Sequence, residues 1–510
     1  MIWIPISYYG SNWGCWEPAA HTAALIGGKT GRYDAPGQLR DNLRKISMAT
    51  SGSAAASREL RTFLEHYPDT NTMELLIPDL AGVLRGKRIR GSEFNKTFRD
   101  GFYMPGGTVL LDTLGNTVSG IRYTADDGDP DILAKVVPGS LAPVPWSKKP
   151  AAQAFFRFFE RDGQPFFADP RCVLEKAMEP LLQMKLSIVM ATELEFYLLD
   201  AKSDRPRARV SRVPGIGRAQ PGPQVYHPDD LWDIENFLDE LHAVCAAQNI
   251  PAGTTTSEFA PGQFEINLDH VASPTLACDH ALLLKRAVKA VARRHGFVAC
   301  FMAKPFEEDS GSGMHIHMSL VDRNGRNYFS QGKESLASPP YSARLRHAIG
   351  GLAKTMAEAT AIFAPNANSY RRLRPEMFAP VEPNWGANHR NVAIRVPVAD
   401  AGNLRFEHRT AGADANPYLV TAAILAGVHH GLTTRCEPGP MVREGDVIEL
   451  ERKIPNRWDA ALDLFAKSRI LPDYLGRRYC QYYVINRREE SRRFHNRVSN
   501  VDFDWYMRAV

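Results

Sequence analysis

The chain has 510 residues, of which 44% are hydrophobic and 23% charged, as is usual for a globular protein. One compact core rarely serves so long a chain, so we expect two or more domains. The formal net charge of +5 is too small to indicate a nucleic-acid or membrane partner. The seven cysteines form no C-x-x-C pair and no apolar run could span a bilayer, which together favour a cytoplasmic protein.

The N-terminal stretch differs from the rest of the chain. Met1–Trp16 is rich in aromatic residues and poor in charge, and helical patterning begins only at Ser57. Residues 1–57 are therefore predicted to be an extension that is either disordered or upstream of the true start, for which Met48 is the candidate. Both alternatives stay open at this point.

Residues 58–150 are predicted to form a small domain of short strands and turns. Strand-like runs at Met73–Ile77 and Val83–Ile89 flank a turn at residues 79–82. Four prolines between residues 138 and 150 then indicate a linker, so we place a domain boundary at residue 150.

Strands and helices alternate after that boundary, which predicts a larger domain over residues 151–510. Apolar periodicity predicts helices at residues 171–185, 230–248, 279–295, 344–361 and 417–431, and strands at residues 187–199, 264–268, 314–321, 392–396 and 403–409.

Acidic residues interrupt the apolar strand at residues 187–199. Glu193 and Glu195 are two apart, so on a strand they project from the same face. Two like charges at that spacing are unfavourable unless a cation neutralises them. A solvent-exposed strand face explains the pair equally well, so this pair alone decides nothing.

Three further groups carry similar residues. Glu258 and Glu265 bracket a Pro-Gly turn, which can bring them together. His315 and His317 alternate along the strand at residues 314–321, although alternating histidines also occur as satisfied core residues. The last group places two arginines around one acid on a strand face, at Arg405, Glu407 and Arg409.

Taken together, five glutamates and one histidine come from four predicted strands and are accompanied by a set of arginines. Oxygen-rich ligands with one imidazole suit Mg²⁺ or Mn²⁺ better than zinc. Cations and arginines that neutralise phosphate oxygens are what phosphoryl transfer requires. The arginines concerned are Arg372, Arg390, Arg395, Arg405 and Arg409.

These motifs, in this order, resemble the glutamine synthetase family from about Leu60 to the C-terminus. The most specific segments are Asn368–Leu373, Ile394–Pro397 and Ala411–Tyr418. Within the family the chain is most similar to the γ-glutamylputrescine synthetases, a similarity carried by residues 166–170, 301–305 and 423–432.

The resemblance implies an α+β fold with a small N-terminal β-grasp domain and a large catalytic domain built on a curved antiparallel sheet. It also implies a homo-oligomer, of the dodecameric type, with active sites between subunits. The implied reaction joins the glutamate γ-carboxyl to an amine through γ-glutamyl phosphate, with ATP as a substrate and two or three Mg²⁺ or Mn²⁺ ions at each site. No nucleic acid or membrane takes part.

The resemblance also implies a role for each site residue. The first metal would be bound by Glu195, Glu258 and Glu265, and the second by Glu193, His315 and Glu407. The nucleotide would lie along His317, Ser319, Arg395 and Arg405, and glutamate would be held by Gly311, Arg372, Arg390 and Arg409. Catalysis would depend on Glu195 and on Arg390 and Arg395, which neutralise the transferred phosphoryl group.

The chain departs from the ammonia-using members at two acids that form the ammonium site. Their flap glutamate in Pro-Gly-Tyr-Glu-Ala-Pro is replaced by Phe378, and their aspartate in Phe-Asp-Gly-Ser has its nearest match at Pro105. Losing both acids favours an organic amine, since a phenyl ring and a proline leave apolar space for a carbon chain. A neighbouring acid, Glu376 or Glu382, could instead take over the lost role.

Putrescine or a related polyamine is the leading substrate, and polyamine utilisation the expected role. Candidates for contact with its distal ammonium are Phe378, Glu376, Glu382 and Trp385. Two alternatives stay open: a glutamine synthetase that uses ammonia, and a catalytically silent family member with a structural or regulatory role. The complete set of predicted metal ligands argues against the silent alternative.

Overall fold

The computed structural model describes residues 52–201, 206–212, 217–219, 225–330, 341–375, 378–443, 446 and 453–510. Most of the predicted N-terminal extension therefore lies outside the described residues, and so does Glu376. The first described helix, α2 (Gly52–His66), begins before the predicted start at Ser57. No helix in the described ranges is both long and apolar enough to cross a membrane.

The N-terminal part is built on a six-stranded sheet in the order β2-β1-β6-β4-β3, with β5 paired to β6. Strand β6 runs parallel to β1 and antiparallel to β4, so this sheet continues past the predicted boundary at residue 150. Its strands are β1 (Thr72–Pro78), β2 (Leu84–Arg90), β3 (Phe102–Pro105), β4 (Asp131–Val136), β5 (Ala142–Pro143) and β6 (Ala151–Phe159).

The larger part is built on a nine-stranded, mostly antiparallel sheet in the order β15-β12-β13-β14-β11-β7-β9-β8, with β10 paired to β7. The long strand β7 (Ser187–Asp200) and its neighbour β11 (Met314–Val321) match the predicted strands closely. The other strands are β8 (Ala252–Ser257), β9 (Gln263–Leu268), β10 (Phe297–Cys300), β12 (Trp385–Ala387), β13 (Ile394–Val396), β14 (Phe406–His408) and β15 (Met441–Val442).

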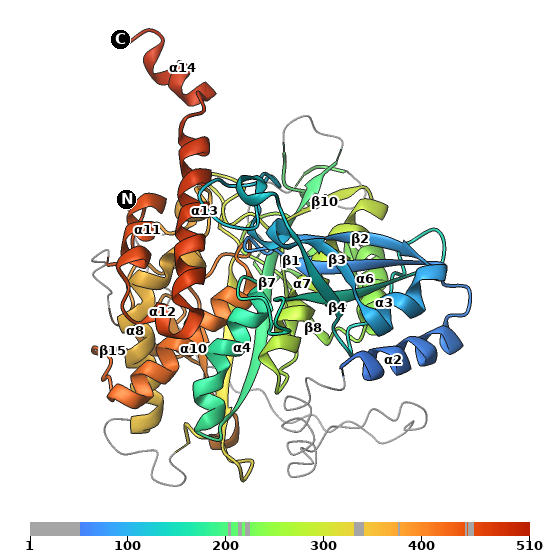
Figure 1. Ribbon diagram of the computed structural model, residues 1–510. Helices are drawn as coiled ribbons and strands as arrows, with labels where there is room; N and C mark the ends of the chain where they lie inside the picture. Colours follow the sequence, from blue (N-terminus) through green and yellow to red (C-terminus); the bar gives the residue numbers. More distant parts are fainter. Residues whose placement is uncertain are drawn as a thin grey trace, which may run out of the picture.

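Helices pack beside the sheets, and together these elements confirm the α+β class (Figure 1). The C-terminal helix α14 projects beyond the body of the protein (Figure 1). The helices after α2 are α3 (Phe94–Asp100), α4 (Pro170–Gln183), α5 (Pro228–Trp232), α6 (Glu235–Ala247), α7 (Pro274–Arg294), α8 (Ala343–Phe363), α9 (Ser369–Arg372), α10 (Pro417–Thr434), α11 (Trp458–Lys467), α12 (Leu471–Leu475), α13 (Arg477–His495) and α14 (Asn500–Tyr506).

Three long helices start where a capping side chain precedes a proline. Asp169, Ser273 and Asn416 each accept a hydrogen bond from a backbone N–H of the first turn of α4, α7 and α10. Proline suits the next position because its missing N–H has no partner in the first turn anyway. Helix α7 therefore begins before the predicted Asp279, at the cap rather than at the first strongly periodic residue.

Two further predicted elements differ from the structure. The helix expected at residues 230–248 is divided into α5 and α6. The strand expected at residues 403–409 is only β14, because Asp400 accepts a hydrogen bond from the backbone N–H of Asn403 and caps a 3-10 turn there.

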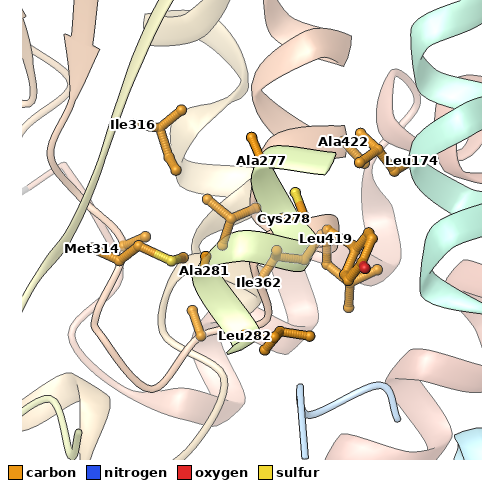
Figure 2. Close-up of a cluster of buried hydrophobic side chains, with 14 of the residues drawn as sticks. Leu174, Ala277, Cys278, Ala281, Leu282, Met314, Ile316, Ile362, Leu419 and Ala422 are labelled. Carbon is orange, nitrogen blue, oxygen red and sulfur yellow. The ribbon is translucent and has the colours of Figure 1, made fainter. Parts of the chain in front are cut away.

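The hydrophobic core beneath the larger sheet determines which face of strand β11 is free to carry functional residues. Met314 and Ile316 of β11 point toward α7 and pack with Ala281 and its neighbours (Figure 2). Since side chains alternate along a strand, His315 and His317 must point to the opposite face of the sheet. That opposite face carries the candidate site.

Candidate active site

The site begins with the register of four adjacent strands, β14, β11, β7 and β9. His317 pairs with Glu407 across β11 and β14, and His315 pairs with Glu193 across β11 and β7. Residues directly opposite one another in a sheet project from the same face. The pairing of Glu195 with Glu265 extends this row to β9. The structure thus brings together acids and histidines that lie far apart in the sequence.

Glu193 is the centre of this cluster. One carboxylate oxygen lies 2.7 Å from Nε2 of His317 and the other lies 3.2 Å from Nδ1 of His315. Among the described residues, two groups can each offer three ligand atoms lying within 4.8 Å of one another: Glu193, His317 and Glu407, and Glu193, Glu265 and His315. Both histidines therefore reach the metal-binding groups, whereas the resemblance assigned only His315 to a metal.

At the β9 end of this row of site residues, the neighbouring carboxylates repel one another. Burial and the neighbouring charge of Glu195 raise the pKa of Glu258 to about 7. Burial and the charges of Glu193, Glu195 and Glu258 raise the pKa of Glu265 well above its usual value. Carboxylates that repel one another in a buried cluster fit hard divalent cations, which supply the missing positive charge. The donor set of this chain therefore fits Mg²⁺ or Mn²⁺.

Glu407 behaves differently, because arginines neutralise it. Its side chain is fully buried, and Nη1 of Arg395 donates to one oxygen at 2.8 Å while Nη1 of Arg409 donates to the other. Although burial alone would raise its pKa, the charges of Arg409 and His315 hold the pKa of Glu407 at about 2. Glu407 is thus ionised at any ordinary pH, and it orients both guanidinium groups.

Two further arginines lie at the open side of the cluster. Nε of Arg405 donates to Nδ1 of His317 at 3.3 Å. Arg390 is exposed, and its Nη1 donates to the hydroxyl of Tyr226 at 3.4 Å. Ser319 continues β11 two residues beyond His317. This arrangement leaves guanidinium groups available to an anionic ligand beside the carboxylates.

Arg372 is buried at the end of α9 and is held by backbone carbonyls. Its Nη1 donates to the carbonyl of Thr410 at 3.0 Å and its Nη2 to that of Arg409 at 3.3 Å. A Cβ atom on Gly311 would lie 2.8 Å from Cγ of Arg372 and 2.6 Å from the carbonyl oxygen of Ala303. Residue 311 must therefore be glycine for the two segments to approach this closely.

Sequence reasoning missed two residues that shape the glycine-rich turn. The backbone N–H of Gly313 donates to Glu195 at 2.6 Å, and a Cβ there would lie 2.7 Å from Nη2 of Arg372. Gln263 donates from Nε2 to the carbonyl of Gly311 at 3.1 Å and accepts from the hydroxyl of Ser310. Glycines 311 and 313 in the sequence are consistent with this close backbone approach, whereas no residue near Gln263 in the sequence indicates that its partner is Gly311.

The residues predicted to bind the amine lie in different surroundings. Phe378 is 56% exposed and its ring centroid lies 4.7 Å from that of Phe259, which is 40% exposed. Oε1 of Glu382 is buried without a hydrogen-bond partner among the described residues. Trp385 packs in the core, with Nε1 donating to the carbonyl of Gly439 at 2.8 Å. Pro105 ends β3 in the N-terminal sheet.

A carboxylate–imidazole cluster accompanied by arginines on one face of an antiparallel sheet is the kind of site that metal-dependent phosphoryl-transfer enzymes use. The family model described as glutamine synthetase, catalytic domain, matches residues 167–506. The chain belongs to the glutamine synthetase family, and it is a carbon–nitrogen ligase.

Individual relatives agree with this assignment. The chain is 39% identical over 470 residues to γ-glutamylputrescine synthetase PuuA of Escherichia coli (strain K12), covering 92% of this chain and 98% of the relative. It is 30% identical over 464 residues to glutamate–isopropylamine ligase of Pseudomonas sp, covering 89% and 98%. The structure resembles that of GmaS without ligand, with a TM-score of 0.74, 26% identity, and coverage of 88% of this chain and 98% of that one.

Proposed function

We propose that this ligase joins the γ-carboxyl of glutamate to an organic amine, most simply putrescine or a related polyamine, in polyamine utilisation. The observation that carries the proposal is the exposed pair of Phe259 and Phe378. The family resemblance puts Phe378 where ammonia-using members have their flap glutamate. Two phenyl rings lack the negative charge with which a carboxylate traps ammonium, but they pack well against the methylene groups of a longer amine. The full alignment with an amine ligase supports the same conclusion.

The chemistry proceeds in two steps. A carboxylate has no good leaving group, so the γ-carboxylate first attacks the γ-phosphate of ATP to give γ-glutamyl phosphate and ADP. The amine then attacks the acyl carbon and displaces phosphate. In this proposal Arg390 and Arg395 neutralise the transferred phosphoryl group, while Arg372 and Arg409 hold glutamate. Orientation of Arg395 by Glu407 keeps one guanidinium group directed at the site.

The remaining site residues are proposed to bind the nucleotide and the metal ions. We assign His317, Ser319 and Arg405 to the nucleotide side, because Arg405 and His317 already contact each other there. Two or three Mg²⁺ or Mn²⁺ ions would be held by the clustered glutamates and histidines, and when bound they neutralise phosphate oxygens.

Metal binding is expected to depend on pH through Glu258 and Glu265. Because their pKa values are raised, these two carboxyls favour the folded metal-free protein most below the ordinary glutamate pKa of 4.5, and that contribution is lost as the pH rises through their folded pKa values, about 7 for Glu258. Added Mn²⁺ or Mg²⁺ binds the ionised forms, so its stabilising effect on Tm should grow between about pH 6 and 8. Thermal scans with and without metal at several pH values measure this, and a constant difference would contradict it.

The assembly is proposed to be a homo-oligomer of the dodecameric type. The C-terminal helix α14 projects from the body and exposes Val501, Phe503, Trp505 and Tyr506 (Figure 1). Exposed aromatic residues on a projecting helix are typical of a contact between subunits. Pro105 would reach an amine site only from such a neighbour, because it lies in a different sheet. A monomeric mass in light scattering would contradict this assembly.

The cytoplasm is the proposed location. The described cysteines, Cys172, Cys245, Cys278, Cys300, Cys436 and Cys480, are free thiols. Free thiols in every described position fit a reducing compartment better than an oxidising one.

A panel of amines tests the proposal. Phosphate release is measured with ATP, Mg²⁺ and glutamate against ammonium, butylamine, putrescine, cadaverine and spermidine. We expect putrescine or a longer polyamine to give the highest kcat/KM, and butylamine to be weaker than putrescine because butylamine lacks the distal ammonium for which Glu382 is the proposed partner. Ammonium as the best amine would overturn the proposal, and turnover with none of them would support a silent homologue.

A further inference from the structure

Asp414 is a charged residue beneath the site that the proposed reaction does not use. It lies in the segment of residues 411–416 between β14 and α10. Its Oδ1 is buried and has no hydrogen-bond partner among the described residues. A Cβ atom on Gly412 would lie only 2.5 Å from that oxygen, so the glycine leaves the space in which the carboxylate sits. A carboxylate placed this tightly needs a reason, since burying it is costly.

The other oxygen of Asp414 holds the start of α9. Oδ2 accepts from the hydroxyl of Ser369 at 2.7 Å and from Nδ2 of Asn366 at 2.8 Å. Asn366 in turn accepts, through its Oδ1, from the backbone N–H of Asn368 at 3.0 Å. Helix α9 is a single turn that begins at Ser369 and ends at Arg372. The direction of Arg372 is therefore set by a turn whose first residue is tied to Asp414.

Arg372 depends on this support because it has few other partners. Its guanidinium group donates to two backbone carbonyls, of Thr410 and Arg409. Burial lowers the pKa of Arg372, while the charges of Glu195 and Asp414 act in the opposite direction. The charges of Lys285 and Arg372 in turn oppose the effect of burial on Asp414. The carboxylate and the guanidinium group thus favour each other's charged form.

We propose that Asp414 is a positioning residue for glutamate: by fixing the first turn of α9 it directs the buried guanidinium group of Arg372 toward the substrate carboxylate. This inference rests on the proposed function, in which Arg372 binds glutamate. The proposal is that Asp414, which does not touch glutamate, nevertheless determines the affinity for glutamate. Asp414 acts through its hydrogen bonds with Ser369 and Asn366.

Asn416 provides a matched control in the same segment. Its Nδ2 donates to the carbonyl of Asp79 in the N-terminal part at 2.9 Å, and its Oδ1 accepts from the backbone N–H of Tyr418 at the start of α10. It therefore stabilises the fold without touching α9. Asn416→Ala is expected to lower Tm while the KM for glutamate stays within about 2-fold of the parent value.

The test is the separate measurement of KM for glutamate and for ATP. Asp414→Asn keeps the size of the side chain but removes its charge, and should raise KM for glutamate about 10-fold with KM for ATP within about 2-fold. Ser369→Ala removes one of the two bonds and should raise KM for glutamate about 3-fold, whereas Ser369→Thr restores the hydroxyl and the parent value. A loss of folding alone would reduce kcat for all substrates together.

Two results overturn the inference. Equal changes in both KM values, or no change in either, would show that Asp414 has no particular connection to glutamate. If Asp414→Asn does not fold, the Ser369→Ala and Ser369→Thr pair decides in the same way. The Arg372→Lys variant distinguishes failure of the proposed function from failure of this inference. If Arg372→Lys leaves the KM for glutamate unchanged, Arg372 does not bind glutamate and its proposed function is wrong. If it raises that KM while the Asp414 and Ser369 variants do not, only this inference fails.

Discussion

Glu265→Gln is expected to reduce kcat by about 10³-fold or more while making the metal-free protein more stable. Glu265 is buried beside Glu193, Glu195 and Glu258, whose charges and burial together raise its pKa well above the usual value. Glutamine has the same shape and no charge. It can still accept from Nδ2 of Asn267, which lies 3.3 Å from Oε1 of Glu265. The substitution therefore removes repulsion and retains the local contact.

The sign of the stability change follows from linkage. An acid whose pKa is raised in the folded state costs stability as pH rises above its unfolded pKa of 4.5. Replacing Glu265 should thus raise the free energy of unfolding at pH 7 and leave it almost unchanged at pH 4. Chemical denaturation in EDTA measures this gain. In saturating Mn²⁺ the difference should shrink or reverse, because the variant has lost a ligand.

A glutamate–histidine contact outside the site supplies the control. Glu240 lies 2.8 Å from Nε2 of His295 and 3.0 Å from Nε of Arg294, on helices away from the catalytic face. Glu240→Gln should leave kcat within about 2-fold of the parent value and should not stabilise the metal-free protein. Full activity of Glu265→Gln, or a metal-free protein that it destabilises at pH 7, would remove Glu265 from the proposed metal site.

The positions of the strands that carry the site could be predicted closely from the sequence. Which strands pair with one another could not be predicted. Alternation of acids or histidines with apolar residues marked β7 and β11, because one face of each strand lies on the core. The pairing of His317 with Glu407 depends instead on which strands become neighbours. No local pattern encodes that register, so only the resemblance to a family could indicate which side chains meet.

Elements whose ends depend on a single hydrogen bond were the least predictable. Asp400 shortens β14 by capping a turn, and residues 233 and 234 divide the helix expected at residues 230–248. The contact of Asp414 with Ser369 joins residues 45 positions apart, and that of Gln263 with Gly311 joins residues 48 apart. Such side-chain contacts follow from tertiary packing and leave no periodic signal.

Phe378→Glu is expected to change which amine the enzyme prefers. The exposed ring of Phe378 packs on Phe259, and this apolar pair favours a carbon chain. A carboxylate there would attract ammonium and could accept its proton, so kcat/KM for ammonium should rise about 10-fold or more. For putrescine, kcat/KM should fall about 10²-fold, since the methylene groups would lose their apolar contact.

The backbone conformation at residue 378 should be unchanged by this substitution. Phe378 has a φ of 56°, in the left-handed region that side chains other than glycine adopt only when the surrounding structure holds them there. Glutamate at this position is strained to a similar degree, so the loop has no reason to rearrange. Phe378→Leu, which keeps the apolar surface and loses only the ring, should retain the preference for putrescine over ammonium. If the leucine and glutamate variants changed amine preference alike, the aromatic ring and not the missing acid would determine specificity.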